Sequence, residues 1–380
     1  MAINLLPDEI INQIAAGEVI ENPGAVVKEL VENSIDSGAD LIEVELEDSG
    51  LKKIVVRDNG GGISKDDLLL APKRHATSKI KSFADLYSIH TMGFRGEALA
   101  SIFSVARARI VSKTDDEGAY EITGDDLENV KESACARGTM IVAEDLFYNT
   151  PARKKYLKSK TGELRAVVDV MNRFCIFYNN IKFVLKHGSK VLINKPKFSS
   201  CEDNLVYNLG RDLKGKLIPF ENEMDGIRVS GFLGKPSEVT YPYVKNQFVY
   251  VNERFVKCKL VRDAVYDGFG TNLMVGRHPI FVLFIDIDPE VIDVNVHPSK
   301  IEIRFENELE VYEFVKKTVR EVFEKSDTVK PFGEENERDL SLDEVTTDVS
   351  LEPKNYPRID RNEQSYFSIE RQKHFELEDE

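Results

Sequence analysis

The pattern of apolar residues near the start of the chain predicts one helix followed by two strands. In "PGAVVKELVENSID", apolar residues return every three or four positions, which is typical of an amphipathic helix. Asn22 followed by Pro23 is a favourable helix start, and Gly38 can end the helix in a left-handed conformation. The next segments, "LIEVELED" and "KKIVVRD", alternate in polarity or run apolar, and both are predicted to be strands.

The second half of the chain contains mostly predicted strands. They fall in the segments "GIRVSGFLG", "QFVYVNERFV", "PIFVLFIDI" and "VIDVNVHPSKIEIRF". Helices are predicted in "CKLVRDAVYDGFG" and in "ELEVYEFVKKTVREVFEK". Between the halves, residues 200–220 mix turn-forming and charged residues and indicate a division. Both halves are therefore expected to be mixed α/β or α+β layers.

Composition excludes several classes of protein. The chain has 380 residues, of which 42% are hydrophobic, and this favours two or more globular domains. No apolar run approaches the roughly 20 residues that span a bilayer, and the first residues do not resemble a signal peptide. The cysteines are far apart and lack the spacing of metal ligands, which favours reduced thiols and a cytoplasmic protein: Cys135, Cys175, Cys201 and Cys258.

The net charge of -15 is concentrated at the C-terminal end. Residues 331–380 hold 15 acidic against 6 basic residues, a net of -9, which leaves -6 for the first 330 residues. That segment also lacks hydrophobic periodicity and is predicted to be a disordered tail or linker. Because the net charge of the first 330 residues is small, this part of the chain can still present a basic groove to nucleic acid.

The polar face of the first predicted helix carries candidate chemistry. Glu29, Asn33 and Asp36 fall about one turn apart. A carboxylate can act as a general base on water, and an asparagine carbonyl is a suitable Mg²⁺ ligand beside phosphate oxygens. Hydrolysis of a phosphoanhydride depends mainly on positioning and charge neutralisation, which such a face can supply. Taken alone, the pattern equally fits a surface helix whose acids face water.

Two further elements extend this interpretation. The turn "RDNGGG" places Asp58 at a strand end, where it can accept a hydrogen bond from an adenine amino group, and its glycines permit close approach of a base. The segment "KRHATSKI…TMGFRGEALAS" supplies hydroxyl and ammonium donors and a glycine-flexed loop before a helix, which is typical of phosphate binding. Each also fits an ordinary turn or loop, and only their occurrence in one order favours a nucleotide site.

One apparent nucleotide motif is rejected. The segment "GRDLKGKL" matches the first seven positions of a P-loop, but Leu217 stands where Ser or Thr must hold Mg²⁺. Pro219 follows shortly afterwards, and no strong strand precedes the segment. Chance explains the match.

Six segments together resemble the MutL family of DNA mismatch-repair proteins: "ELVENSIDSGA", "RDNGGGI", "RHATSKI", "GFRGEALASI", "DLFYNTPAR" and "IDVNVHPSK". The family belongs to the GHKL-type ATPase superfamily of type II topoisomerases, ninety-kilodalton heat-shock chaperones and sensor histidine kinases. The resemblance covers about residues 1–325. It implies an α+β fold with a GHKL-type ATPase α/β sandwich at residues 1–210 and a ribosomal-protein-like transducer and DNA-binding α+β domain at residues 211–330. The acidic tail or linker would occupy residues 331–380.

The resemblance implies a role for each matching position. Glu29 would be the general base, Asn33 would hold Mg²⁺, and Asp58 would read the adenine of ATP. Lys300, in "NVHPSK", would act in catalysis by reaching the γ-phosphate from the second domain, although alone it also fits a solvated lysine. The other implied nucleotide contacts include a lid over residues 73–97: Asp36, Gly60, Gly62, Thr77, Ser78, Lys79, Gly93, Phe94, Arg95, Gly96, Glu97 and Thr139.

The resemblance also implies partners. ATP would close two protomers into a homodimer that clamps DNA without sequence specificity and couples a MutS-type mismatch sensor to repair factors; no membrane partner is expected. Basic residues in the segments "TPARKKYLKSK" and "NERFVKCKLVR" are predicted to contact DNA phosphates, although each also fits solvated surface: Arg153, Lys154, Lys155, Arg254, Lys257, Lys259 and Arg262.

Two other functions remain open at this point. One is an ATP-gated binding switch that needs no turnover, and the other is a different superfamily member such as a topoisomerase subunit or chaperone. "GFRGEAL" and "NVHPSK" argue against the second. The sequence departs from the family pattern at Gly61 and at Glu253, where relatives often carry a larger residue and a glycine respectively. No "DQHA"-type sequence appears, so no nuclease activity is predicted.

Overall fold

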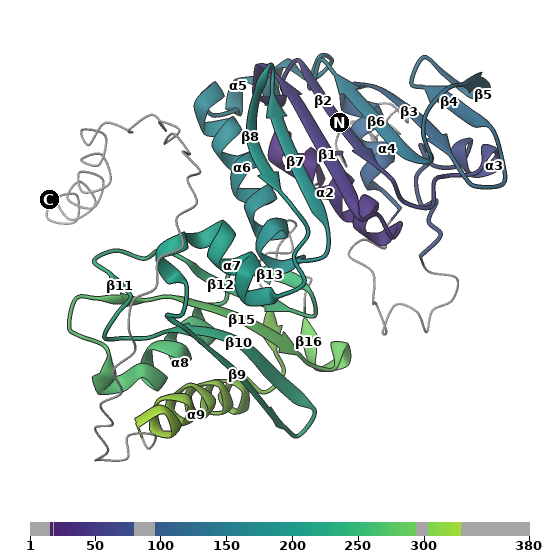
Figure 1. The fold of residues 1–380 in the computed structure, drawn as a ribbon. Coiled ribbons are helices and arrows are strands. Elements are labelled where there is room, and N and C mark those ends of the chain that lie inside the picture. Colours follow the sequence, from purple (N-terminus) through teal and green to yellow (C-terminus); the bar gives the residue numbers. More distant parts are fainter. Residues whose placement is uncertain (1–15, 18, 80–95, 294–302, 328–380) are drawn as a thin grey trace, which may run out of the picture. The chain divides into compact units, whose positions relative to one another are not determined.

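A computed structural model describes residues 16–17, 19–79, 96–293 and 303–327, which fall within one compact unit, Met1–Lys330 (Figure 1). The tail predicted for residues 331–380 lies outside the described residues. Among the helices that are described, none is both long and apolar enough to cross a membrane.

An eight-stranded sheet forms the N-terminal half. Its strands are β1 (Leu41–Glu47), β2 (Lys53–Asp58), β3 (Arg107–Lys113), β4 (Ala119–Thr123), β5 (Asp126–Ser133), β6 (Gly138–Glu144), β7 (Lys182–His187) and β8 (Lys190–Lys195). They are ordered β5-β4-β3-β6-β2-β1-β7-β8. β1 pairs in parallel with β7, whereas the other neighbours in this sheet are antiparallel.

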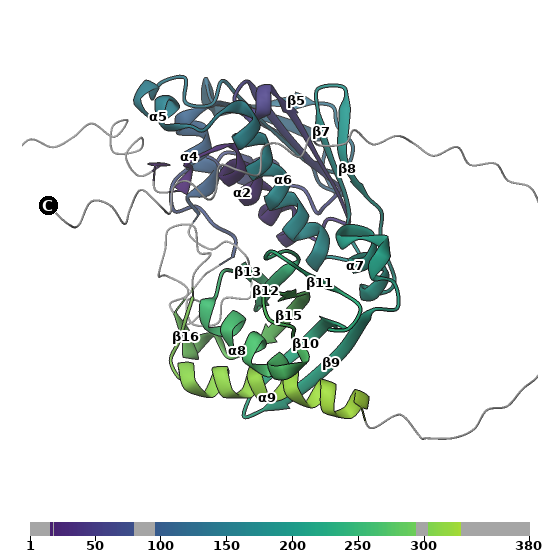
Figure 2. The ribbon, with the colours of Figure 1, turned by 90° about the vertical axis from the view of Figure 1, so that its left-hand side faces the viewer.

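Helices α2 (Pro23–Asp36), α4 (Ala98–Val105) and α6 (Lys160–Phe177) cover one face of this sheet (Figure 2). The alternation of β1 explains the layer, because Ile42, Val44 and Leu46 are buried beneath the helices. Glu45 points to the opposite face, where it pairs with Arg57 and Lys186 at 3.0 and 3.4 Å. The strands predicted in "LIEVELED" and "KKIVVRD" are therefore confirmed as β1 and β2, whereas most of the strand predicted in "VIDVNVHPSKIEIRF" lies outside the described residues. Two shorter helices, α3 (Lys65–Leu68) and α5 (Pro151–Tyr156), complete this half.

The first predicted helix is confirmed as α2, with the expected ends. The side chain of Asn22 accepts a hydrogen bond from the Ala25 N–H at 3.0 Å, and Pro23 occupies the first turn. Gly38 has a φ of +77°, so the chain leaves the helix through a left-handed residue.

A five-stranded sheet forms the second half, in the order β13-β12-β15-β10-β9. One face, including Val249, Val251 and Leu283, packs on two helices, the predicted α8 (Lys259–Phe269) and α9 (Glu308–Asp327). Those helices lie close together, since a Cβ on Gly268 would be 2.6 Å from the Cβ of Val319. The strands are β9 (Leu217–Met224), β10 (Ile227–Gly234), β12 (Gln247–Val251), β13 (Arg254–Val256) and β15 (Phe281–Asp286). Two short ladders pair β11 (Thr240–Tyr241) with β14 (His278–Pro279), and β16 (Ile292–Asp293) with β17 (Arg304–Phe305).

The opposite face of the second sheet packs against the end of α6. Tyr250 is buried there, and its hydroxyl donates to the carbonyl oxygen of Arg173 at 2.8 Å. A helix that the sequence did not predict, α7 (Cys201–Leu209), lies beside this contact. Its buried Asn204 donates to the carbonyls of Cys175 and Ile176 at 3.0 and 2.9 Å. This helix occupies nearly half of residues 200–220, the segment in which a division between the two halves was predicted.

The local structure supports the rejection of "GRDLKGKL" as a P-loop. Gly210 ends α7, and Leu217 begins the strand β9. A P-loop instead connects a strand to the N-terminus of a helix, whose amide groups face the phosphates. This segment has the reverse order of elements.

Lys195 is a fully buried lysine that supplies hydrogen bonds to backbone carbonyl groups just after the end of α6. Its ammonium group donates to the carbonyl oxygens of Tyr178, Asn179 and Ile181, the last two at 3.0 and 2.8 Å. We expect Lys195→Met to fill the same volume but leave these carbonyls without a donor, which lowers the free energy of unfolding by about 2–4 kcal/mol. Urea unfolding measures this change. Lys190→Met, at the exposed start of the same strand, is the matched control. A loss no larger than that of the control would contradict the role of Lys195.

Candidate active site

The acidic face of α2 is held in place by a lysine on the same helix. Lys28 Nζ lies 3.1 Å from Glu29 Oε1 and 2.9 Å from Glu32 Oε2, and Glu32 is buried. Burial opposes the charge on Lys28, but Glu32 and Glu29 outweigh it and raise the pKa of the ammonium group. The apolar residues Val27, Leu30 and Val31 of α2 are buried in the core, so the helix cannot rotate without exposing them.

One turn further along α2, the side-chain oxygens of Asn33 and Asp36 bind the ammonium group of a lysine that is distant in the sequence. Lys79 Nζ donates to Asn33 Oδ1 at 2.9 Å and to the carboxylate of Asp36 at 2.5 Å. The side chains of Lys79 and Asp36 are only 18% and 12% exposed. An amide oxygen beside one carboxylate, completed by phosphate oxygens and water, is a donor set that suits Mg²⁺. The ammonium group acts as a stand-in ion, so these residues fit a bound divalent cation.

Asp58, at the end of β2, is a half-buried acceptor fixed by three donors. Ser34 Oγ donates to its Oδ2 at 2.8 Å, while the N–H groups of Gly60 and Thr139 donate to its Oδ1 at 3.0 and 3.2 Å. Burial raises the pKa of Asp58, and the hydrogen bonds to the charged form oppose that shift. Because Ser34 belongs to α2, the acidic helix and this carboxylate form one rigid constellation.

The turn around Asp58 leaves no space for side chains at two glycines. Gly62 has a φ of +77°, and a Cβ there would lie 2.3 Å from the carbonyl oxygen of Lys113. Gly138, at the start of β6, has a φ of +112°, and its Cβ would lie 2.0 Å from the carbonyl oxygen of Asp58. Only glycine fits either position.

A buried hydroxyl network joins Thr139 to this turn. Thr139 Oγ1 lies 2.9 Å from Ser112 Oγ, which also accepts a hydrogen bond from the Ile63 N–H at 2.8 Å and donates to the Gly138 carbonyl at 3.1 Å. Sequence reasoning missed Ser34, Ser112 and Gly138. The sequence contained one signal for Ser112, a hydroxyl on the strand face that otherwise carries the apolar Ala108 and Ile110.

Two protein-family models match the two halves of the chain. "Histidine kinase-, DNA gyrase B-, and HSP90-like ATPase" matches residues 21–150, and "DNA mismatch repair protein, C-terminal domain" matches residues 206–324. The DNA mismatch repair protein MutL of Clostridium botulinum (strain 657 / Type Ba4) is 46% identical over 324 residues, an alignment that covers 84% of this chain and 48% of that protein. The chain belongs to the MutL family. It spans about half the length of the curated relatives that it matches.

Solved structures agree with the assignment to the MutL family. The "Crystal Structure of N terminal domain of a DNA repair protein" has a TM-score of 0.69 and 26% identity, covering 84% of this chain and all of that one. The "Aquifex aeolicus MutL ATPase domain complexed with ADP" has a TM-score of 0.53 and 25% identity, covering 71% and 94%. The predicted α+β fold, with a GHKL-type ATPase domain followed by a mismatch-repair domain, is confirmed.

The residues predicted to contact the phosphates lie only partly within the described part of the chain. Lys79 N–H donates to Thr77 Oγ1 at 3.1 Å, and the His75 N–H donates to the Gly96 carbonyl at 3.1 Å, so the beginning and end of the predicted lid lie together. Glu97 is the N-cap residue of α4. Ser78 lies in the same described stretch as Thr77. Four predicted residues lie outside the described residues: Gly93, Phe94, Arg95 and Lys300.

The basic residues that MutL resemblance assigned to DNA fall into two groups. Lys154 and Lys155 on α5, and Lys257, Lys259 and Arg262 near α8, are exposed. Lys259 is paired with Asp263 at 2.7 Å. The DNA contacts of this exposed group stay a prediction.

The other two basic residues, Arg153 and Arg254, lie against the protein. A Cβ on Gly17 would be 2.0 Å from Arg153 Nη2, so that guanidinium packs on the backbone. Burial lowers the pKa of Arg254, against the opposing charges of Glu32, Asp36 and Glu29. Because these carboxylates act on its charge, Arg254 lies near the acidic face of α2. For these two residues the predicted phosphate contact is also untested, and their surroundings differ from an open groove.

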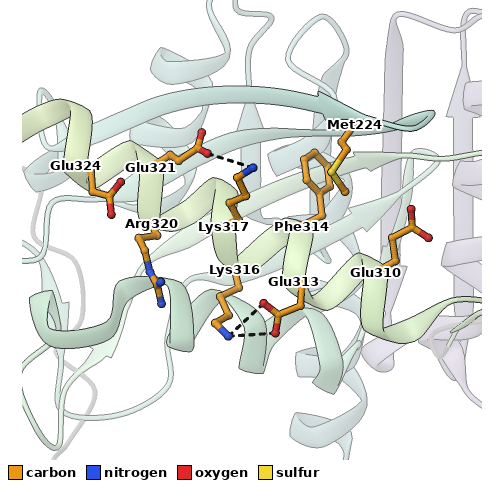
Figure 3. A pocket seen from close by; sticks show the side chains of 9 residues that line it. All are labelled: Met224, Glu310, Glu313, Phe314, Lys316, Lys317, Arg320, Glu321 and Glu324. Atoms are coloured by element: carbon orange, nitrogen blue, oxygen red, sulfur yellow. Dashed lines mark hydrogen bonds and ion pairs between the residues drawn. The ribbon is translucent and has the colours of Figure 1, made fainter.

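A separate groove of about 530 Å³ lies along α9 (Figure 3). No residue assigned to the MutL nucleotide site lines it. Several of its charges pair with one another, including Lys316 with Glu313 at 3.1 Å and Lys317 with Glu321 at 3.9 Å. The lining residues are Met224, Glu310, Glu313, Phe314, Lys316, Lys317, Arg320, Glu321 and Glu324. The groove therefore presents a rim of four acidic and three basic side chains around the apolar Met224 and Phe314.

Proposed function

We propose that this chain binds ATP between α2 and the turn after β2 and hydrolyses it, as the ATPase region of a DNA mismatch-repair protein. The observation that carries the proposal is the hydrogen bond of 2.8 Å from Ser34 to Asp58. It fixes the adenine-reading carboxylate to the same helix that carries Glu29 and Asn33. One rigid helix thus serves both ends of the nucleotide, and the match to the ATPase family model over residues 21–150 supports the same assignment.

In the proposed mechanism, Glu29 accepts the proton of the attacking water, and Lys28 stabilises the charge on that carboxylate. Asn33 and Asp36 would hold Mg²⁺, which when bound neutralises phosphate charge. Asp58 orients the nucleotide by accepting a hydrogen bond from the adenine amino group. The remaining predicted contacts to the nucleotide come from Gly60, Gly62, Thr77, Ser78, Lys79, Gly93, Phe94, Arg95, Gly96, Glu97, Thr139 and Lys300.

We also propose that ATP binding closes two protomers into a dimer that holds DNA and couples a MutS-type mismatch sensor to repair. The support is the family, together with the exposed basic residues on α5 and near α8. Phosphate contacts of this kind carry no sequence information, so binding should be non-specific and sensitive to salt.

The test of this function is Mg²⁺-dependent ATP hydrolysis by the 380-residue chain, with and without single-stranded DNA at low salt. We expect slow turnover that DNA raises, and dimers on sizing with a non-hydrolysable ATP analogue. Lys154→Ala with Lys155→Ala should reduce the slope of DNA affinity against salt by about one per lost phosphate contact, whereas exposed Lys190→Ala should not. Failure to bind the nucleotide would overturn the proposed function, and an unchanged salt slope would overturn the DNA surface.

A further inference from the structure

The lysine at the end of the described lid segment contacts the residues assigned to the metal. Lys79 Nζ donates to Asn33 Oδ1 at 2.9 Å and to the Asp36 carboxylate. Asn33 and Asp36 belong to α2, whereas Lys79 lies 43 residues further along the chain than Asp36. The contact is therefore a tertiary one. Because Lys79 and Asp36 are both largely buried, solvent screens it less than it would screen a surface pair.

The ammonium group and a divalent cation require the same oxygens. Mg²⁺ binds oxygen ligands at about 2.0–2.1 Å and demands near-octahedral geometry. An ammonium hydrogen bonded to the same amide oxygen would lie within a few ångströms of that ion, and two positive charges at such a distance repel strongly where water is scarce. The two cations thus exclude each other at Asn33 and Asp36.

We propose that Lys79 competes with the divalent cation for Asn33 and Asp36, and that metal–nucleotide binding transfers its ammonium group from these oxygens to the phosphates. The inference rests on the proposed ATP site. The Lys79 N–H bonds to Thr77 Oγ1 at 3.1 Å, which keeps the displaced lysine beside the hydroxyls assigned to phosphate. Without nucleotide, the ammonium group of Lys79 therefore occupies the oxygens that would bind the metal. When the nucleotide binds, its phosphates become the hydrogen-bond acceptors of Lys79 and the metal takes those oxygens.

Because of this competition, Lys79 weakens the binding of the metal alone but strengthens the binding of the nucleotide. Removal of the ammonium group takes one competing cation away from Asn33 and Asp36, so the affinity for the metal alone rises. The same removal deletes a phosphate partner, so the affinity for the nucleotide falls. A lysine that only stabilised the fold, or only bound phosphate, would not produce this pair of changes.

The experiment measures Mn²⁺ binding to the full 380-residue chain without nucleotide, from the electron paramagnetic resonance signal of free Mn²⁺. We expect Lys79→Met to raise Mn²⁺ affinity about fivefold or more and to weaken binding of a non-hydrolysable ATP analogue about tenfold. Adding Asn33→Ala to Lys79→Met should abolish the gain in Mn²⁺ affinity, because the freed amide oxygen is then absent. A gain that survives Asn33→Ala would show that the Mn²⁺ binds elsewhere and would overturn the proposal.

Lys28→Met is the matched control. It removes the same charge from the same acidic face, but Lys28 contacts Glu29 and Glu32 and leaves Asn33 and Asp36 held. A gain in Mn²⁺ affinity that is equal in both variants reflects net charge alone and overturns the competition, as does no gain in Lys79→Met. Wild-type protein that fails to bind the ATP analogue would instead overturn the proposed function. Thermal melting of each variant verifies that it is folded.

Discussion

Glu29→Ala is expected to lower ATP turnover by at least about 100-fold, since a general base typically contributes about 10²–10⁴ to the rate. Nucleotide affinity should change by less than about threefold, because Glu29 acts on water and the adenine end of the site is held by Asp58 and Ser34. The fold should survive, since the packing of α2 depends on its opposite, apolar face.

Single-turnover hydrolysis and equilibrium binding of an ATP analogue separate these two effects. Glu32→Gln is the control, because Glu32 shares Lys28 with Glu29 but is buried toward the protein. If Glu32→Gln reduced turnover as strongly as Glu29→Ala, the effect would come from the charge around Lys28. If ATP turnover were unchanged in Glu29→Ala, Glu29 would be excluded as the general base.

Asp58→Asn is expected to weaken ATP binding about 30-fold to 100-fold, because a hydrogen bond to a charged acceptor is worth about 1.5–3 kcal/mol and the amide presents a donor to the adenine amino group. The local structure tolerates the change. Asparagine retains an oxygen for the N–H groups of Gly60 and Thr139, and its amide can donate to Ser34 Oγ. Isothermal calorimetry with ATP and GTP measures the result. Preference for ATP over GTP should collapse, since guanine offers an oxygen where adenine offers an amino group.

The raised pKa of Asp58 adds a dependence on pH to the same prediction. Adenine recognition needs the carboxylate, so wild-type ATP affinity stays constant above the raised pKa and falls as pH decreases through it. The fall begins at a higher pH than for an ordinary aspartate. The stability of the fold depends on pH in the opposite direction. A pKa that is raised in the folded state means that the charged carboxylate lowers the free energy of unfolding above that pKa. Asp58→Asn should therefore not destabilise the protein at neutral pH. A pH profile of ATP affinity that is shared by wild type and Asp58→Asn would contradict the assignment.

Sequence patterns were sufficient where structure is local. The helix α2 and the strands β1 and β2 follow from periodicity and caps within a few residues of one another. Contacts between distant segments were not accessible in this way. The bond from the Thr139 N–H to Asp58 spans 81 residues, and the hydroxyl pair of Ser112 and Thr139 is buried between two strands. The proximity of Arg254 to the acids of α2 depends on how the second sheet packs, which no local pattern reports.

The helix α7 was missed for a related reason. Its first turn contains Glu202 and Asp203, and its polar Asn204 looks suited to a turn. In the folded protein, Asn204 is buried and donates to two carbonyls at the end of α6. Asn204, whose residue type disfavours the interior of a helix, thus stabilises α7 through tertiary hydrogen bonds.

The parallel pairing of β1 with β7 has a consequence for synthesis on the ribosome. Leu41 lies beside Lys182, so one edge of β1 has no partner until about 140 further residues have been translated. All the described residues assigned to ATP precede β7, and the N-terminal sheet therefore remains open after that part of the site has been made. An uncovered edge of this kind pairs readily with other chains, so the growing polypeptide passes through a stage at which aggregation competes with completion of the sheet.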